Sequence, residues 1–375
     1  MIHITDLHNC CGCEACSVIC PKQCITMQSD ATEGFRYPQV DVSRCVGCNA
    51  CERVCPMLND ASDRNPLRVF AAQAEDEVIR RQSSSGAVFT ALAQNIISRG
   101  GMVFGVAFDD DFRSVSFVST DNAEGLAAMR GSKYLQANAN GVYARVCEAL
   151  RLNRPVLFTG TPCQVRALRL FLAKDASSPL LYCVDIVCHG VPSAEVWSRY
   201  LTGLCAGHRV SSVSFRDKSS GWKDFGMAIT GDSLRYVRVH RDDLYMKSFL
   251  RNVNLRPSCY RCNAKHGRSG ADITIGDFWG VPAPDYDSNG VSQVIVMTER
   301  GAQWLSDCGI DGNDYPVDIV RQHNSAFFVS VAEPTRRRFF WCYYRADFAK
   351  AVRLSTEYRS LLTRLKSFIR KNIKA

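Results

Sequence analysis

The sequence predicts a small α+β module at the N-terminus, then an α/β domain with a mostly parallel sheet and a β-rich insert, and finally an amphipathic C-terminal helix. Three observations predict this order. One cysteine motif occurs twice within residues 10–56, strand-like and helix-like segments alternate over residues 69–204, and short strands with Gly and Asp turns occupy residues 209–239. Alternating strands and helices are typical of a parallel sheet covered by helices.

The cysteine motif has a spacing that favours iron–sulfur clusters. Each copy reads C-x2-C-x2-C-x3-C-P. This spacing lets a short loop bind one 4Fe-4S cluster through three thiolates while the fourth thiolate reaches the neighbouring cluster. Two copies therefore predict two clusters. By this rule the ligands of one cluster are Cys10, Cys13, Cys16 and Cys55, and those of the other are Cys45, Cys48, Cys51 and Cys20.

Zinc and disulfides account for the motif less well. A structural zinc site usually takes two separated C-x2-C pairs, so the third cysteine of each copy is surplus to it. A disulfide framework is unexpected in a chain of 375 residues with no signal-peptide pattern and 19 cysteines, an odd number. Residues 1–60 resemble the bacterial-type two-cluster ferredoxins, so a ferredoxin-like domain is expected there, with strands at 25–27 and 37–42. Cys11 and Cys24 fall outside the spacing and are expected to be packing residues.

Composition and charge narrow the classes of function. Hydrophobic residues make up 46% of the chain and charged residues 22%, without an apolar run near 18 residues, which predicts a soluble protein. The first residues lack the basic and apolar regions of a secretory signal, so a cytoplasmic location is expected. The net charge is +9, but residues 346–375 carry eight Lys or Arg against Asp347 and Glu357. Because the basic excess lies in one tail, nucleic acid is not an expected partner.

The larger domain is expected over residues 65–345, after a polar linker at 57–68. Its expected strands are 69–74, 102–108, 114–119, 133–136, 156–159, 180–187, 272–275 and 291–298. Its expected helices are 87–98, 124–130, 141–152, 165–174, 194–204 and 300–308. Ligands of such sheets collect at the carboxyl ends of strands. The segments 159–164 and 188–193 follow strands and are therefore candidate binding loops.

The clearest of these helices is the one at residues 87–98. Apolar residues recur on one face from Val88 to Ile96, and a Gly-Gly pair then supplies the stop. The serine cluster at residues 83–85 precedes the helix. It is expected to act as an N-cap, although the free main-chain N–H groups there would also suit a phosphate.

Four further cysteines lie beside predicted strands, next to Gly or Pro or within a C-x2-C pair. They are Cys163, Cys188, Cys259 and Cys262. Four thiols suffice for one more metal centre. Two other interpretations stay open from the residues alone: Cys163 near a helix N-terminus could be a nucleophile with a lowered pKa, and the C-x2-C pair could be half of a zinc site. His189 is expected to be a hydrogen-bonding residue of the loop.

Residues 346–375 are expected to form a basic amphipathic helix. An apolar stripe lies opposite basic residues in it and consists of Leu354, Tyr358, Leu361, Leu362, Leu365, Phe368 and Ile369. Such a helix can lie on its own domain, or it can contact an acidic partner or the inner face of a membrane as a peripheral protein does.

Several short motifs occur in an order that resembles one known family. They are Ser84-Ser85-Gly86, Gly131-Ser132-Lys133-Tyr134, Thr161-Pro162-Cys163-Gln164, Cys188-His189-Gly190, Cys259-Tyr260-Arg261-Cys262 and Gly276-Asp277-Phe278-Trp279-Gly280. Together they resemble the coenzyme F420 hydrogenase/dehydrogenase beta-subunit family over about residues 65–330. With the ferredoxin-like domain in front, the layout is similar to the electron-input subunits of F420H2 dehydrogenases.

The resemblance implies FAD, iron–sulfur clusters and hydride exchange between the flavin and a two-electron carrier such as coenzyme F420. The residues that it implies near the flavin are Ser84, Ser85, Gly86, Gly131, Ser132, Lys133, Tyr134, Asp277 and Trp279. It also implies a third 4Fe-4S cluster, bound by Cys163, Cys188, Cys259 and Cys262. Lys133 would be a charge partner for a flavin phosphate or the reduced ring, and no catalytic residue is identified.

The expected function is thus that of an iron–sulfur flavoprotein oxidoreductase. Its partner would be a redox protein or a small-molecule electron carrier. Two alternatives remain: a reductase of another organic substrate, for example in surface-polysaccharide synthesis, and a non-catalytic iron–sulfur electron-transfer adaptor.

Overall fold

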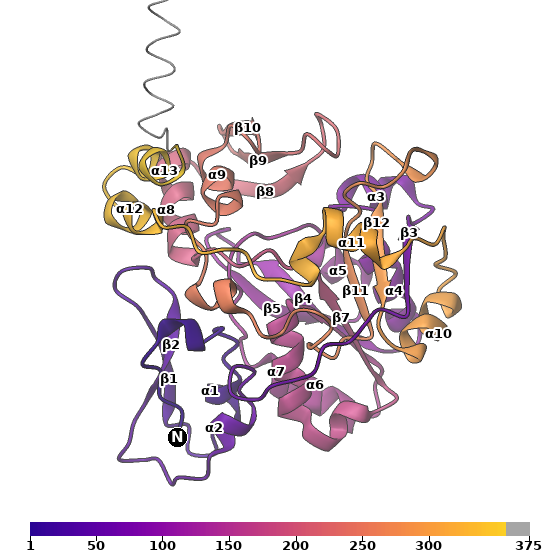
Figure 1. The fold of residues 1–375 in the computed structure, drawn as a ribbon, viewed down its shortest axis with the longest axis horizontal. Coiled ribbons are helices and arrows are strands. Elements are labelled where there is room, and N and C mark those ends of the chain that lie inside the picture. Colours follow the sequence, from indigo (N-terminus) through magenta and orange to yellow (C-terminus); the bar gives the residue numbers. More distant parts are fainter. Residues whose placement is uncertain (358–375) are drawn as a thin grey trace, which may run out of the picture.

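The computed structural model describes residues 1–357, which form a small N-terminal module beside a larger body (Figure 1). The module consists of the strands β1 (Ile25–Ser29) and β2 (Arg36–Val40) and the helices α1 (Ala15–Ile19) and α2 (Ala50–Arg53). The two strands pair antiparallel, as expected from the sequence. Cys16 lies in α1 and Cys51 in α2, so each cysteine run continues into a short helix.

Seven strands form the central sheet of the body, in the order β3-β12-β11-β7-β6-β4-β5. They are β3 (Arg68–Ala72), β4 (Met102–Phe108), β5 (Val115–Thr120), β6 (Val156–Gly160), β7 (Leu181–Ile186), β11 (Ile273–Asp277) and β12 (Ser292–Val296). The four inner strands β11, β7, β6 and β4 pair in parallel. β12 is antiparallel to both of its neighbours, β3 and β11, and β5 is antiparallel to β4. Five strands therefore point one way, which confirms the predicted mostly parallel sheet.

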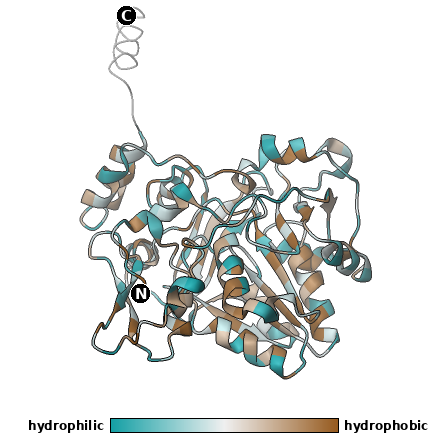
Figure 2. Cartoon of the chain, turned by 60° about the horizontal axis from the view of Figure 1, so that its bottom comes forward, coloured by the Kyte–Doolittle hydropathy of each residue, from teal (hydrophilic) through white to brown (hydrophobic). Residues whose placement is uncertain are grey.

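Helices cover both faces of this sheet. They are α3 (Glu77–Gln82), α4 (Val88–Ser98), α5 (Ala123–Met129), α6 (Val142–Arg151), α7 (Pro162–Leu172) and α10 (Glu299–Asp307). Successive residues of a strand point to opposite faces. In β6, Val156 and Phe158 pack in the core beneath α6 and α7, whereas Leu157 packs in the core beneath α4 and α10. The inner strands are mostly hydrophobic for this reason (Figure 2), although β7 contains Asp185 and β11 ends in Asp277.

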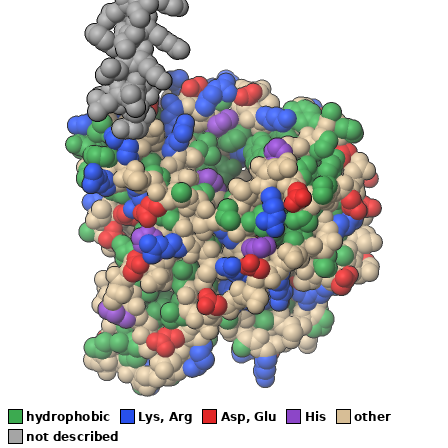
Figure 3. All heavy atoms as spheres, viewed as in Figure 1, with side chains coloured by type: hydrophobic (Ala, Val, Ile, Leu, Met, Phe, Trp, Pro, Cys, Tyr) green, Lys and Arg blue, Asp and Glu red, His purple; other side chains and the backbone are tan. Residues whose placement is uncertain are grey.

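A three-stranded antiparallel sheet and further helices complete the body. They are α8 (Ala194–Cys205), β8 (Val210–Asp217), β9 (Gly226–Gly231), β10 (Arg235–Val239), α9 (Leu244–Leu250), α11 (Val317–His323), α12 (Arg337–Tyr343) and α13 (Phe348–Thr356). The order β10-β9-β8 confirms the predicted β-rich insert. Lys and Arg side chains gather on the surface around this insert and around α12 and α13 (Figure 3).

Two expectations about the elements are wrong. Residues 133–136 form no strand: the Lys133 ammonium donates back to the end of α5, and the Gln136 N–H donates to the carbonyl of Pro192 at 2.9 Å. Helix α7 begins at Pro162 and not at residue 165. Thr161 and Gln164 form a capping box, and proline is favoured at the first helical position. Cys163 therefore lies in the first turn of a helix and not in a loop.

The C-terminal helix is shorter in the described chain than expected. Helix α13 spans Phe348–Thr356, with Ala351 and Val352 buried against α12 and α9. This part of the predicted helix lies on its own domain. The stripe residues Tyr358, Leu361, Leu362, Leu365, Phe368 and Ile369 lie outside the described residues. Within residues 1–357, no helix has the length and apolar character needed to span a membrane.

The module is held to the body by side chains that donate to main-chain carbonyls of the first cysteine loop. Arg256 Nε donates to the carbonyl of Cys10 at 2.6 Å, and the Tyr143 hydroxyl donates to that of Cys13 at 2.8 Å. Gln136 Nε2 donates to the carbonyls of Cys11 and Gly12 at 3.2 and 3.1 Å. Four successive carbonyls of one loop thus find their donors on the body.

A buried ion pair makes a second connection. Arg337 of α12 donates through both of its terminal nitrogens to the Glu33 carboxylate, with Nη1 at 2.5 Å from Oε1. Both side chains are only 11% exposed. Arg337 also donates to the carbonyl of Leu255 at 3.0 Å. The end of the described chain is thus fastened to the turn between β1 and β2.

We expect Arg337→Ala to lower the free energy of unfolding by about 3–5 kcal/mol, because it leaves the Glu33 carboxylate buried without its partner. Thermal unfolding followed by circular dichroism at one heating rate measures the change. Arg338→Ala is the matched control, since Arg338 is the next residue of α12 and is exposed. Equal melting temperatures for the two variants would contradict this account.

Candidate functional site

A cavity of about 690 Å³ lies at the carboxyl ends of the parallel strands, beneath the β-rich insert. Residues 159–161 at the end of β6, 186–191 at the end of β7 and beyond it, and 275–277 at the end of β11 line its floor, while Arg216 and Phe225 of the insert line its roof. Both binding loops expected from the sequence contribute to it. Its volume lies within the usual range for ligand pockets, about 300–1,000 Å³.

The serine cluster lies at one end of this cavity but does not cap α4. The N-cap residue of α4 is Ala87, in the left-handed conformation and without a side-chain capping bond. Ser84 Oγ lies 2.9 Å from Ser132 Oγ and accepts the Ser132 N–H at 2.7 Å. Ser85 Oγ donates to the carbonyl of Val291 at 2.6 Å. The expected cap is therefore wrong, and Ser84 instead joins two segments of the cavity wall.

Gly86 lies behind the cavity wall and does not line it. A Cβ atom at this position would collide with the carbonyl oxygen of Ala72 and would lie 2.7 Å from the nitrogen of Ser292. Both are main-chain atoms of neighbouring strands, so they cannot give way easily. The Gly86 N–H donates to Ser292 Oγ at 3.0 Å. The glycine thus lets the serine loop pack closely on the sheet.

Gly131, Ser132, Lys133 and Tyr134 line the cavity together. Lys133 Nζ donates to three main-chain carbonyls at the end of α5, those of Met129 at 3.1 Å, Arg130 at 2.8 Å and Gly131 at 3.2 Å. These acceptors are neutral, and burial lowers the pKa of Lys133 to about 7. The ammonium would be stabilised by any anion that enters this end of the cavity.

Asp277 and Trp279 form the opposite wall with residues of the insert. Asp277 Oδ1 accepts from Arg216 Nη2 at 2.8 Å and from Trp222 Nε1 at 2.9 Å. Burial raises the pKa of Asp277, and the Arg216 guanidinium opposes that rise. The rings of Trp222 and Trp279 stack at 5.1 Å, and Arg216 lies 3.8 Å from the centre of the Phe225 ring. Asp277 therefore anchors the insert to the end of β11.

The four additional cysteines lie close together beside the cavity. Cys163 lies in the first turn of α7, Cys188 follows β7, and Cys259 and Cys262 lie in and just after the 3₁₀ helix η3 (Pro257–Arg261). Burial raises the pKa of the Cys188 thiol, and Cys259, Cys163 and Cys262 are near enough to raise it further. Cys188 also lines the cavity. The adjacent His189 hydrogen-bonds to Asn252 Oδ1 at 2.5 Å, as expected of a loop residue.

The ferredoxin-like cysteines gather in two neighbouring places, and Cys51 lies near Cys16 and Cys55 at the point where these places meet. Burial raises the pKa of the Cys16 thiol, and the neighbouring Cys10 and Cys55 raise it further. Cys13 lies near Cys16 and Cys55 as well. The other group consists of Cys20, Cys45, Cys48 and Cys51, which line one small cavity together with Cys24.

The chemistry of these donors fits iron–sulfur clusters, since each group supplies four thiols. All 19 cysteines lie within the described residues, and none forms a disulfide. Among residues 1–357, no group of three or more His, Cys, Asp or Glu side chains is arranged to hold a single metal ion. The ligands of a 4Fe-4S cluster surround a multi-iron core and need not meet at one point.

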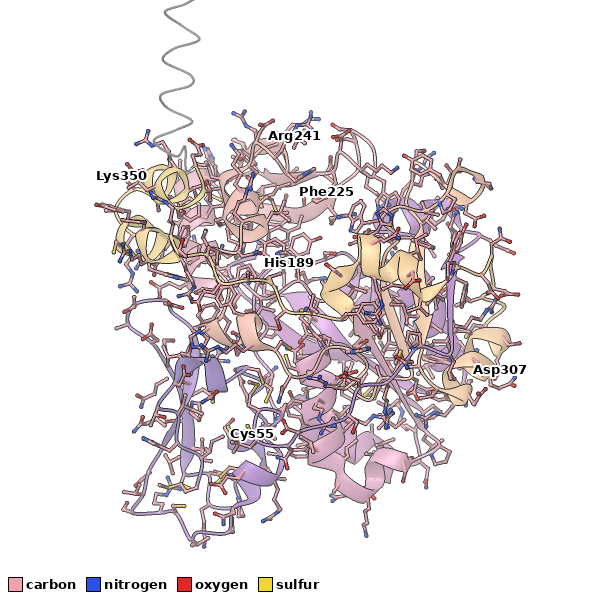
Figure 4. All side chains as sticks on the ribbon, viewed as in Figure 1. Cys55, His189, Phe225, Arg241, Asp307 and Lys350 are labelled. Carbon is pink, nitrogen blue, oxygen red and sulfur yellow. The ribbon has the colours of Figure 1, made fainter. Side chains whose placement is uncertain are left out.

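Cys11 packs in the main hydrophobic core, as expected, and it also lies between two of the cysteine groups. Its thiol is near enough to those of Cys13 and Cys163 to shift its pKa, which burial also raises. The Cys10 group and the Cys163 group are therefore neighbours across the interface. At the far end of the module Cys48 is exposed. The cysteines thus run from the surface of the module to the cavity, with Cys55 in the module and His189 at the cavity (Figure 4).

Three models of known families match this chain. The 4Fe-4S dicluster domain matches residues 9–59. The N-terminal part of the coenzyme F420 hydrogenase/dehydrogenase beta subunit matches residues 69–142, and its C-terminal part matches residues 153–313. The chain belongs to the coenzyme F420 hydrogenase/dehydrogenase beta-subunit family. The family and the dicluster domain indicate a protein of redox electron transfer that contains iron–sulfur clusters.

One solved structure similar to this beta-subunit family member is a chain of the F420-reducing [NiFe] hydrogenase complex from Methanosarcina barkeri, studied by xenon derivatization. The two chains are 16% identical, with a TM-score of 0.48. The similarity covers 76% of this chain and 91% of that one. The comparison with curated proteins gave no match.

The sequence of this family member does not reveal the residues that the insert adds to the site. Lys223 and Phe225, between β8 and β9, and His240, just after β10, line the cavity. They occur in no short motif, and the three strands carry no ligand-type spacing. Only the packing of the insert over the sheet places them there, through the contact between Arg216 and Asp277.

We expect Asp277→Asn to lower the free energy of unfolding by about 3–5 kcal/mol, because Arg216 is 3% exposed and would lose its carboxylate. Asp224→Asn is the control. Asp224 pairs with Arg241, but these side chains are 58% and 61% exposed, so its loss should cost about 0–1 kcal/mol. Urea unfolding of both variants measures the difference. Similar midpoints would show that Asp277 does not anchor the insert.

Proposed function

We propose that this protein is an iron–sulfur flavoprotein oxidoreductase, which passes electrons between 4Fe-4S clusters, FAD and a two-electron carrier or substrate such as coenzyme F420. One observation carries the proposal. The Cys163 group lies between the ferredoxin-like module and the cavity: Cys11 of the module lies near Cys163, and Cys188 lines the cavity. A third cluster there would connect the two clusters of the module with a ligand in the cavity.

The walls of the cavity support FAD as that ligand. At one end, Ser84, Ser132, Lys133 and the first turn of α4 offer hydroxyl, ammonium and main-chain N–H groups, which suit phosphate. At the other end, Phe225 and Trp279 offer flat apolar surfaces that suit a ring system. A molecule with both a diphosphate and a planar ring matches these two ends.

When bound, a flavin supplies the exchange between two-electron and one-electron chemistry. The protein's own residues have simpler tasks. Lys133 would neutralise negative charge at the phosphate end or at the reduced ring, and the insert would exclude water from the ring end. Arg216 and Asp277 would hold the insert in that position. Cys163, Cys188, Cys259 and Cys262 would bind the cluster nearest to the cavity.

The exposed end of the module is the natural place for a redox partner protein, because Cys48 lies at the surface there. A small-molecule electron carrier would instead use the cavity. We place the protein in the cytoplasm, where thiols stay reduced.

Iron, sulfide and released flavin, measured on one anaerobic preparation, test the proposed function. Two clusters and a third give about twelve irons per chain, together with one FAD. About eight irons without flavin would contradict the proposal and would leave an electron-transfer adaptor as the better account.

We expect Cys259→Ala to lower the iron content by about one third, from about twelve to about eight irons per chain, because it removes a ligand of the proposed third cluster. Cys308→Ala is the matched control, since Cys308 directly follows α10 and lies outside the three groups. Iron that stays equal in the two variants would exclude a third cluster at Cys259.

We expect the affinity of the flavin-free protein for FAD to fall as the pH rises above about 7. Lys133 has a pKa of about 7 in the flavin-free cavity. Below that pH it is already charged, whereas above it each binding event must also take up a proton, which weakens binding by up to about tenfold per pH unit. Flavin fluorescence quenching measures the dissociation constant.

Lys133→Met should bind FAD more weakly at pH 6 and should lose the dependence on pH above 7. A variant that keeps the wild-type pH profile would assign the titrating group to another residue.

A further inference from the structure

Arg256 is a fully buried cation at the interface between the module and the body. Its exposure is 0%, and it directly precedes the 3₁₀ helix that carries Cys259. A guanidinium group keeps its charge in proteins. Burying such a charge is costly unless hydrogen bonds and an opposite charge compensate for it. Arg256 therefore requires hydrogen-bond acceptors and a negative charge close to its guanidinium group.

The hydrogen bonds of Arg256 converge on the first cysteine loop. Nε donates to the carbonyl of Cys10 at 2.6 Å, and Nη2 donates to the Cys10 sulfur at 3.3 Å. Nη2 also donates to the carbonyl of Arg36 at 2.9 Å, and Nη1 donates to Gln136 Oε1 at 2.9 Å. The guanidinium carbon lies 4.3 Å from the centre of the Tyr37 ring. Each nitrogen of the guanidinium thus has a partner.

None of these acceptors is a carboxylate. Glu14 is near enough to interact with Arg256, but its carboxylate bonds to Arg36 and accepts the Ala139 N–H at 3.2 Å. The other acceptors are two carbonyls and an amide, which are neutral. The Cys10 sulfur is the one hydrogen-bonded acceptor of Arg256 that becomes an anion when it binds iron.

We propose that Arg256 is the buried counter-charge of the 4Fe-4S cluster that Cys10 binds, and that it raises the reduction potential of this cluster. The inference rests on the cluster assignment of the proposed function. One-electron reduction adds one negative charge to the cluster, and a fixed positive charge in a buried site stabilises the reduced form. A hydrogen bond to a ligand sulfur acts in the same direction.

The second group of the module has cations near it, but these cations are exposed. Arg53 Nη1 donates to the carbonyl of Cys48 at 2.8 Å, and the N-terminal ammonium lies near Cys51 and Cys45. Water and salt screen such exposed charges much more than they screen a buried one. The Cys51 sulfur accepts from a neutral main-chain N–H, that of Ile2 at 3.4 Å, and Cys48 of the same group is exposed to water.

Arg256 therefore makes a difference in potential between the two clusters. One electron would move from the exposed cluster, which is oxidised, to the cluster of Cys10, which is reduced. The positive charge thus favours electron flow toward the body.

Potentiometry followed by electron paramagnetic resonance, on the anaerobic full-length protein, tests this proposal. Arg256→Gln keeps amide donors but removes the charge. We expect it to lower the potential of one cluster by at least a tenfold change in the reduction equilibrium, which is about 59 mV for one electron. Arg256→Lys keeps the charge and should stay much closer to the wild type. If the shift came from a general loss of packing, the two variants would show similar reduction potentials.

Arg166→Met is the matched control, because Arg166 also bonds to the module, at the carbonyls of Asn59 and Asp60, but donates to no cysteine sulfur within the described residues. It should leave both potentials unchanged. The proposal is overturned if Arg256→Gln retains its iron with wild-type potentials, or if Arg256→Lys shifts as far as Arg256→Gln. If the Gln variant loses iron, the Lys variant decides alone: a shift of tenfold or more overturns the proposal.

The proposed function can fail separately from this inference. Wild-type protein without flavin or a third cluster contradicts the proposed function, yet it still carries the two clusters of the module on which these potentials are measured.

Discussion

The structure depends on how the first cysteine loop pairs its main-chain carbonyls. A loop that wraps a cluster cannot satisfy them by a helix or a sheet, and a buried carbonyl without a donor is costly. Here Arg256, Gln136 and Tyr143 of the body donate to the carbonyls of four successive residues, from Cys10 to Cys13. This pairing fixes the module on the body. It also brings Cys11 to Cys163, so the contact between the two cysteine groups follows from it.

The same interface limits what the sequence can predict. The expected membership of the two ferredoxin-like groups follows from spacing, because the loops are short and the ligands local. The cavity follows from the rule that ligands collect at strand ends. The place of Cys11 between two cysteine groups and the role of Arg256 could not be predicted, since both depend on partners more than 100 residues away. Neither residue belongs to a local pattern.

The two errors in the cavity wall have one physical origin. Residues 83–85 were assigned by local preference as a helix cap, and residues 133–136 as a strand. In the structure Ser84 bonds to Ser132, just before the expected strand, and Lys133 turns back onto the end of α5. Tertiary hydrogen bonds thus outweigh local preference there. Polar side chains that bond across a cavity wall are a sign of a ligand site more than of secondary structure.

The ion pair between Glu33 and Arg337 has a consequence for the synthesis of the protein. Its partners are 304 residues apart. At about 5–20 residues per second, the ribosome needs roughly 15–60 seconds to make the intervening chain. The donors for the first cysteine loop also emerge after the loop itself. During that interval the nascent module has its cysteines, but the part of the body that it packs against is still incomplete. The loop therefore remains hydrated and open. The ion pair between Glu33 and Arg337 can form only after helix α12 has been synthesised.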